Sequence, residues 1–298
     1  MQVFSERTDK PHAYLFGEYT NQLSFDPIEL ALSEDSQVWQ SIFDNTNLSN
    51  VYLIDFDWLP PVIADTYRIA GTRDGQQLAN SRLDQRDIVL KFIAYCQGDA
   101  DEKLTLQSLS NFLIRRHNYW IAFGNGGGRM YHVREKTITA EYYDDKMMMV
   151  TVTLNNFTGV AQSIMPSIHI NEMPNIGLGL PTDTVNYVFN TSEFDVNNIG
   201  ELPVDPLVQG DYLDVTLTCT GSPTITNTTT GDAIACTKQL TTSDTFNLIG
   251  VNPQINGKAA GINTDNGIIR LASGNNHFKI TGCQDLNCTV SFYFKYLN

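Results

Sequence analysis

The stretch AFGNGGGRMYHV, residues 122–133, places four glycines within five positions immediately before Arg129. Such a run forms either a phosphate-binding loop or the turn of a β-hairpin. A phosphate loop leads from a strand into a helix whose first N–H groups point at the anion. Here HNYWIAF (117–123) precedes the glycines, and RMYHVREKTITAEYY (129–143) follows them with β-branched and aromatic residues and no helical stripe. We therefore predict a β-hairpin in which glycine provides the positive φ angles of the turn.

The segments around this hairpin predict one helix among strands. Residues 99–116 place Leu106, Leu109, Phe112 and Leu113 on one helical face, with acidic residues at the start and two arginines at the end. Residues 86–95 and 147–157 are rich in β-branched or alternating apolar residues, which is typical of strands. Met147, Met148 and Met149 are interpreted as core-filling residues of the second of these strands.

A change in composition divides the chain into two expected domains. Residues 166–183 contain three prolines without clear periodicity, which is typical of a linker. We therefore expect a first domain at 1–165 and a second at 184–298. The second half predicts a β-sandwich, because short apolar segments recur between turn formers. The expected strands are 211–219, 232–240, 245–251, 267–273, 277–282 and 289–297.

The charge and length of the chain restrict its function. The net charge is −14 over 298 residues, and each half on either side of residue 170 carries −7. A nucleic-acid partner is therefore not expected, since binding phosphates requires a basic surface. The sequence contains no apolar run long enough to span a bilayer. Its first residues, MQVFSERTDKPHAYLF, do not match a signal peptide, so we expect assembly in a cytosol with reduced cysteines.

No combination of residues predicts a reactive centre. His132 and Glu135 would point to opposite faces of a strand, and His169 with Glu172 has no third metal ligand nearby. Cys283 and Cys288 have no second cysteine pair at a zinc-binding spacing. The nucleophile motif G-x-S-x-G is absent from the sequence. We accordingly expect no catalytic residue, no metal and no cofactor, although a pair of glycosidase carboxylates stays open among so many acids.

Taken in order, these segments resemble the distal tail proteins of long-tailed siphophages. The resemblance is carried by GTRDGQQLANSRLDQRDIVLKF (71–92), by the helix and NYWIAFGNGGGRMYHVREKTI (118–138), by YVFNTSEFDVNNIGELPVDPLV (187–208), and by TITNTTTGDAI (224–234) with IIRLASGNNHFKITG (268–282). It covers most of the chain by pattern, and the first 35 residues match least.

The resemblance implies a mainly β structural protein of the virion. The N-terminal belt domain would combine a β-sandwich, one α-helix and a β-hairpin, and the C-terminal domain would be a galectin-like β-sandwich. Belt domains would close into a homohexameric ring, single or stacked back to back. That ring would join the tail tube protein to the tail fibre or tail-associated lysin and to the receptor-binding protein at the tail tip.

Ring closure predicts interface residues on the hairpin, because an unpaired sheet edge is costly unless another subunit covers it. The expected interface residues are Trp120, Arg129, Tyr131, Tyr142 and Tyr143. The alternative is that these aromatic residues fill the core of their own domain. A second hypothesis for the whole protein is a carbohydrate-binding module that recognises host cell-wall polysaccharide. Residues 171–298 offer that hypothesis no Trp, one His (His277) and one Arg (Arg270).

Overall fold

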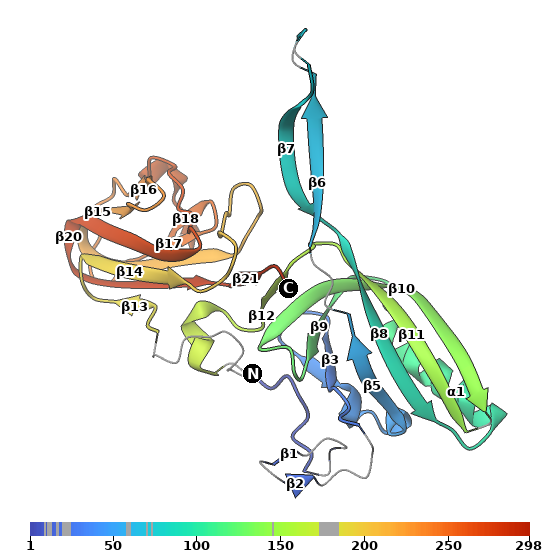
Figure 1. The fold of residues 1–298 in the computed structure, drawn as a ribbon. Coiled ribbons are helices and arrows are strands. Elements are labelled where there is room, and N and C mark those ends of the chain that lie inside the picture. The colour runs from blue at the N-terminus through green and yellow to red at the C-terminus, as the bar shows by residue number, and fades with distance from the viewer. Residues whose placement is uncertain are drawn as a thin grey trace. The chain divides into compact units, whose positions relative to one another are not determined.

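The computed structural model describes residues 1–8, 10, 14–15, 18–19, 25–57, 61–69, 71–72, 74–144, 146–172 and 185–298. The fold is mainly β and forms β-sandwich domains, as the sequence predicts (Figure 1). Two compact units are present. Unit 1 comprises Met1–Ala161 with Leu297–Asn298, and unit 2 comprises Gln162–Tyr296. Most of the expected linker, residues 173–183, lies outside the described residues.

Unit 1 contains one large antiparallel sheet and two separate two-stranded sheets. The large sheet has the strand order β4-β3-β9-β10-β11-β8-β5, and β1 pairs with β2 and β6 with β7. Three short helical segments join them: the 3-10 turns η1 (Ile42–Asp44) and η2 (Thr46–Leu48), and the helix α1 (Asp99–Leu113). The strands are β1 (Tyr14–Leu15), β2 (Glu18–Tyr19), β3 (Leu30–Ser33), β4 (Trp39–Ser41), β5 (Val51–Phe56), β6 (Val62–Arg68), β7 (Gln77–Asp84), β8 (Arg86–Tyr95), β9 (Tyr119–Phe123), β10 (Arg129–Asp144) and β11 (Met147–Asn156).

The core of unit 1 lies on one face of its large sheet. Alternate residues of β8 and β11 are buried, because successive side chains of a strand point to opposite faces. Leu90 lies opposite Val152, and both side chains are fully buried. Of the three methionines that begin β11, only Met148 points into the core; Met147 and Met149 are half-buried.

The helix α1 ends earlier than the sequence suggests. Leu109, Phe112 and Leu113 are buried as expected, but Ile114 has an extended backbone with φ −80° and ψ 121°. The Arg115 guanidinium then donates hydrogen bonds to the carbonyls of Asn111 at 2.8 Å and Ile114 at 3.1 Å. A cation at this position stabilises the negative end of the helix dipole. Arg115 therefore follows the helix and caps it, so the predicted end at residue 116 is three residues too late.

The glycine-rich stretch is the turn of a β-hairpin. Strands β9 and β10 pair antiparallel, with Tyr131 opposite Ile121 and His132 opposite Trp120. Gly127 and Gly128 have φ angles of 64° and 72°, a conformation that other residues rarely adopt. The prediction of a hairpin in place of a phosphate loop is confirmed.

Unit 2 contains an eight-stranded antiparallel sheet with the order β13-β20-β15-β17-β18-β19, in which β14 also pairs with β20 and β16 with β15. The short strands β12 and β21 and the 3-10 turns η3 (Ser167–Glu172) and η4 (Gly261–Asn263) complete the elements. The strands are β12 (Ala161–Ser163), β13 (Val188–Phe189), β14 (Glu193–Asn198), β15 (Leu213–Asn227), β16 (Asp232–Ala235), β17 (Thr245–Ile249), β18 (Asn252–Ile255), β19 (Lys258–Ala259), β20 (Gly274–Phe292) and β21 (Lys295–Tyr296).

Two long bulged strands replace several of the expected short ones. The expected strand 211–219 ends before Gly221, but β15 continues to Asn227, with Gly221 at φ 133°. Likewise β20 runs through Gly282 and joins two of the expected strands into one. Bulges absorb these residues, and a bulge bends a strand without ending it. Residues 267–273, predicted as a strand, contribute only an isolated bridge from Leu271 to Val204.

Candidate interaction surfaces

The five residues that the sequence proposes for an interface lie in two different environments. Trp120 is half-buried, and its ring stacks on His132 with centroids 4.2 Å apart. Tyr131 is buried, with 3% of its surface exposed. Tyr142 and Tyr143 are 54% and 58% exposed at the far end of β10. The structure does not bring all five together, because β10 is long enough to cross from the core to the surface.

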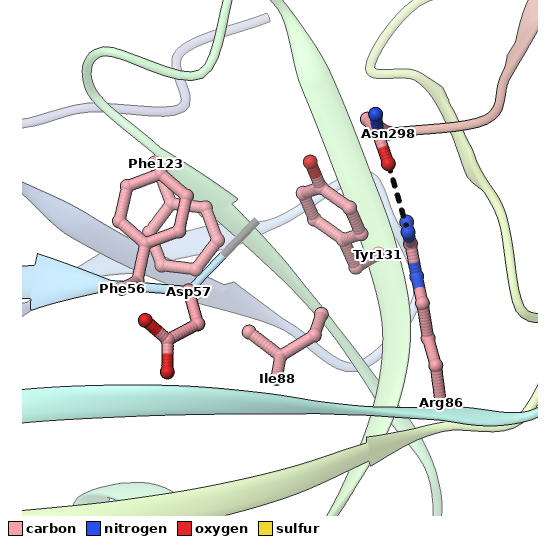
Figure 2. Close-up of a pocket in the computed structure, with 7 residues that line it drawn as sticks. All are labelled: Phe56, Asp57, Arg86, Ile88, Phe123, Tyr131 and Asn298. Carbon is pink, nitrogen blue, oxygen red and sulfur yellow. Dashed lines mark hydrogen bonds between the residues drawn. The ribbon is translucent and has the colours of Figure 1, made fainter. Parts of the chain in front are cut away.

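Tyr131 borders a small cavity in unit 1 (Figure 2). Its volume is about 10 Å³, and Phe56 and Phe123 stack beside it with ring centroids 3.9 Å apart. The Arg86 guanidinium donates to the Asn298 side-chain oxygen at 3.0 Å, and Arg129 donates to the Asn298 main-chain oxygen at 2.7 Å. A cavity of this size holds at most one water molecule. Arg86 and Arg129 therefore hold Asn298 in place. The cavity itself is too small for a substrate.

The electrostatics of this cavity follow from its burial. Burial raises the pKa of Tyr131 to about 12, although the charges of Arg129 and Arg86 act in the opposite direction. Burial also lowers the pKa of the Arg86 guanidinium. Tyr131 therefore stays protonated at neutral pH and acts as a packing residue. Its position favours the core alternative for this tyrosine over an exposed interface.

The second half of β10 is the first candidate surface. Strand β9 pairs with β10 only as far as Val133, whereas β11 pairs with it from Val133 to Asp144. Beyond Val133, β9 therefore no longer covers this edge of β10. Every residue from 134 to 143 is half-exposed or exposed. We call residues 134–143 the β10 edge; its backbone can accept another strand.

The hairpin of β6 and β7 is the second candidate surface. It forms a two-stranded sheet of its own, and nearly all of its side chains are exposed on both faces. Tyr67 lies directly opposite Leu78, and they are 54% and 55% exposed. Ile63 and Ile69 add 64% and 74% exposed side chains. An isolated two-stranded hairpin is at best marginally stable in water, so this one has the properties of an element that a partner covers.

A groove of about 270 Å³ opens at the β3–β4 turn. Glu34 in its wall pairs with Arg115 at 3.3 Å and with His117 at 3.4 Å. Asp35 accepts hydrogen bonds from the backbone of Val38 and Gln37, which lower its pKa. The indole N–H of Trp39 donates to the Ser36 carbonyl at 3.3 Å. The polar groups of the groove are thus largely engaged by the turn itself and by Arg115 and His117.

The histidines of interest have partners within their own unit. His132 lies against Trp120 and also packs edge-on to Phe157 at 4.7 Å. His169 pairs with Glu172 at 3.2 Å. His277 lies within β20, where its Nδ1 is 2.7 Å from Asp195. Among the described residues, no group of three or more His, Cys, Asp or Glu side chains is arranged to hold a metal ion.

Unit 2 also contains a bidentate ion pair. Arg270 donates to the two carboxylate oxygens of Asp232 at 2.7 and 3.0 Å, and its backbone N–H donates to the same carboxylate at 3.1 Å. The Asp232 side chain is 9% exposed. Burial alone would raise the pKa of Asp232, but the bonds from Arg270 outweigh it and the pKa is lowered. The only arginine after residue 171 is therefore engaged within its own unit.

The sequence predicts Tyr142 and Tyr143 of the β10 edge as interface residues, but the exposed hairpin of β6 and β7 is not among its predictions. Residues 61–69 carry the β-branched and aromatic composition of a strand, and the glycines of 71–75 indicate a turn. These signals could have located the hairpin of β6 and β7. They could not have shown its exposure, since a strand's composition does not reveal whether another element covers it.

No helix in the described part of the chain is long and apolar enough to cross a membrane. No family model matches the sequence, and no curated protein matches it.

Solved structures do resemble this one. The chain is similar to the SPP1 Dit protein, whose structure is described as a paradigm of the hub adsorption apparatus in phages that infect Gram-positive bacteria. The identity is 14%, the TM-score is 0.63, and the alignment covers 89% of this chain and 99% of that one. A chain of the activated phage P2 baseplate with calcium aligns at 9% identity with a TM-score of 0.40, covering 89% of this chain and 98% of that one. The chain therefore shares its fold with the SPP1 Dit protein.

Proposed function

We propose that this protein is a structural component of a siphophage tail tip. Six copies form a ring that joins the tail tube protein to the tail fibre or lysin and to the receptor-binding protein. The fold shared with the SPP1 Dit protein over nearly the whole of both chains supports this role. The exposed hairpin of β6 and β7 is the observation that carries the assembly.

The hairpin supports assembly because of the apolar surface it presents. Tyr67 and Leu78 form a cross-strand pair, and more than half of each side chain is in contact with water. Burying apolar area yields about 25 cal/mol per Å². A neighbouring subunit that covers these side chains would gain this energy and order the hairpin at the same time.

The β10 edge supplies a second contact in the same proposal. Its backbone offers hydrogen bonds to a strand from the next subunit, and Tyr142 and Tyr143 stand exposed at its end. A repeated contact between two different surfaces of one chain is heterologous, and such contacts generate rings when the rotation closes. The hairpin and the β10 edge are the two surfaces that we assign to this contact.

The function proposed is geometric, and the protein acts without catalysis. The cavity beside Arg86 is too small for a substrate, and Glu34 of the groove forms an ion pair with Arg115. Its place is the virion, after assembly in the host cytoplasm. The carbohydrate-binding alternative gains no support in unit 2, where Arg270 and His277 pair with carboxylates.

The double variant Tyr67→Ser/Leu78→Ser tests the hairpin's role. Light scattering should give six times the 33.3 kDa chain mass for the wild type and a lower mass for the variant. Leu207→Ser is the matched control, because Leu207 is a 60% exposed aliphatic residue of unit 2. Equal masses for the wild type and the hairpin variant would refute the assignment of this surface.

A further inference from the structure

Unit 2 exposes a group of large apolar side chains on two turns. The first turn lies between β14 and β15, and the second lies where β17 joins β18. The side chains are between 37% and 71% exposed, and they belong to Leu207, Val208, Tyr212, Ile249 and Val251. We call these five residues the unit 2 patch. Single exposed apolar residues are ordinary on a protein surface, whereas a contiguous group of them marks an interaction site.

The two turns lie side by side. A Cβ built on Gly250 of the second turn would be 3.8 Å from the Cβ of Pro206 in the first. Ile249 lies opposite Asp214 in the ladder between β15 and β17, and Tyr212 precedes Asp214 by two positions. The apolar side chains of the two turns are therefore neighbours on the surface of unit 2.

Hydrogen bonds hold the first turn in its exposed conformation. The carboxylate of Asp205 accepts bonds from the backbone N–H groups of Leu207 and Val208, both at 2.9 Å. The backbone N–H of Asp205 donates to the carboxylate of Asp211 at 3.0 Å, and Gly210 has a φ of 69°. A turn fixed in this way keeps Leu207 and Val208 in water until another molecule covers them. Because it is already ordered, binding to it costs little conformational entropy.

Acidic residues accompany the unit 2 patch. Asp205 and Asp211 belong to the first turn, and Asp214 lies near the start of β15. Lys295 forms an ion pair with Asp211. Arg270, whose pKa the charge of Asp205 helps to raise, is already held in an ion pair of its own. Within the described part of the chain, neither Asp205 nor Asp214 forms an ion pair, so the patch is bordered by unneutralised negative charge.

Asp214 is a half-buried carboxylate. The hydroxyl of Thr216 donates to it at 3.2 Å, and burial raises its pKa. A carboxylate that has lost part of its water is costly unless a cation or hydrogen bonds replace that water. A basic side chain brought by another molecule would therefore be stabilised beside Asp214.

We propose that the unit 2 patch docks a partner protein that presents a basic side chain among apolar ones. The apolar side chains of the partner cover Leu207, Val208 and Tyr212, and its basic side chain pairs with Asp214. Protein interfaces commonly combine an apolar centre with charges that complement those of the partner. The partner is another protein of the same tail tip, so this docking rests on the proposed function. It is a contact separate from the one that closes the ring.

The acidic charge also decides between possible occupants of the patch. A second copy of this chain carries a net charge of −14, and a nucleic acid or an anionic membrane is negative as well. Each of these would bring like charges close to Asp205 and Asp214, which is unfavourable. A basic and partly apolar protein surface is the occupant that matches both the charge and the apolar area of the patch.

Hydroxyl-radical footprinting tests this docking in the phage particle that contains the protein. Intact particles, the purified full chain and the denatured chain are labelled under the same conditions, digested and compared by mass spectrometry. Oxidation of Leu207, Val208 and Tyr212 should be several-fold lower in the particle than in the purified chain. Tyr67 of the β6–β7 hairpin reports on the ring contact in the same digest, because the proposed ring covers it.

The two proposals fail in different ways. A patch that is oxidised equally in the particle and in the purified chain, with Tyr67 protected relative to the denatured chain, would overturn the docking and leave the ring. Full oxidation of both the patch and Tyr67 in the particle would overturn both. A patch that is already protected in the purified chain would identify a second copy as its occupant and would also overturn the proposal.

Charge variants at Val208 test the basic character of the partner. Val208 is 71% exposed, so neither Val208→Lys nor Val208→Glu should disturb the fold. Both variants remove the same apolar side chain, but only the lysine repels a basic partner. In particles that carry Val208→Lys, the oxidation of Tyr212 should rise several-fold, whereas Val208→Glu should keep more of the protection.

Val188→Lys is the matched control for these variants. Val188 is a 46% exposed valine on β13, and β20 and β15 separate that strand from β17 in the sheet. Val188→Lys should leave the oxidation of Tyr212 as it is in wild-type particles. Equal effects of Val208→Lys and Val208→Glu, or a larger effect of Val208→Glu, would contradict a basic partner.

Discussion

Trp120 and His132 lie directly opposite each other on β9 and β10, and their rings stack with an interplanar angle of 12°. A cross-strand pair of this kind fixes the register of the hairpin that the glycine turn begins. Phe157 packs edge-on against the His132 ring, with ring centroids 4.7 Å apart. The imidazole is thus held between two aromatic rings, and that surrounding determines its ionisation.

The surroundings of His132 predict that unit 1 loses stability in acid. Burial lowers the pKa of His132 below its ordinary 6.5. The unfolded chain therefore binds the proton more readily than the folded one, and the stability that the neutral imidazole confers is lost as pH falls below about 6.5 through the folded pKa. His132→Phe keeps an aromatic ring and removes the titration. We expect its melting temperature to fall less than that of the wild type between about pH 7.5 and 5. Parallel curves for the two proteins would contradict this account.

The ion pair of Asp232 with Arg270 predicts that the stability of unit 2 falls in acid, at a lower pH than the effect of His132. Its pKa is lowered by the bonds from Arg270 despite its burial, so it stabilises the fold above the unfolded pKa of about 3.9 and loses this effect as pH falls through the folded pKa. Asp232→Asn should cost about 1.5–3 kcal/mol at neutral pH, the range for hydrogen bonds to charged groups. Urea unfolding should show that the difference between wild type and variant narrows toward about pH 3. A difference that stays constant would show that the ion pair is not its source.

The backbone packed against Gly200 in unit 2 leaves no room for a side chain at this position. A Cβ at this position would lie 2.8 Å from both the backbone nitrogen and the oxygen of Lys295. Backbone cannot move aside as a flexible side chain can, so Gly200→Ala should destabilise unit 2 by about 1–3 kcal/mol. Gly261→Ala is the control, because its Cβ would meet only the Asn266 side chain at 3.3 Å. Chemical unfolding that ranks the two variants equally would remove the steric explanation.

Replacing Tyr142 and Tyr143 tests the effect on assembly separately from the effect on folding. Both side chains are more than half exposed, so Tyr142→Ser/Tyr143→Ser should leave the free energy of unfolding within about 0.5 kcal/mol of the wild-type value. If the β10 edge contacts a neighbouring subunit, the same variant should sediment as a smaller species than the wild type at equal concentration. Tyr212→Ser serves as the control, since Tyr212 is a 45% exposed tyrosine of unit 2. A double variant that assembles as the wild type does would show that the β10 edge is not part of the proposed contact.

The parts of the fold that could be predicted from the sequence are those with strong local signals. The β-branched and aromatic residues of 86–95 predict β8 with its observed bounds, and the predicted strand 147–157 differs from β11 by one residue. The glycines before Arg129 demand a turn, because Gly127 and Gly128 adopt positive φ. In each case, the local sequence and the tertiary structure require the same conformation.

The errors arise where pairing overrides a local break signal. Gly221 and Gly282 look like interruptions, but the ladder between β15 and β20 continues past both as bulges. The exposure of the hairpin at Tyr67 depends on long-range geometry, which leaves no spacing in the sequence that could have predicted it.

Electron microscopy of the purified full chain tests the central claim most directly. If the protein's role is to assemble through the hairpin of β6 and β7 and the β10 edge, class averages should show closed rings with sixfold symmetry. Isolated particles of single-chain size at every concentration, with no ring even in the presence of tail tube protein, would contradict the account.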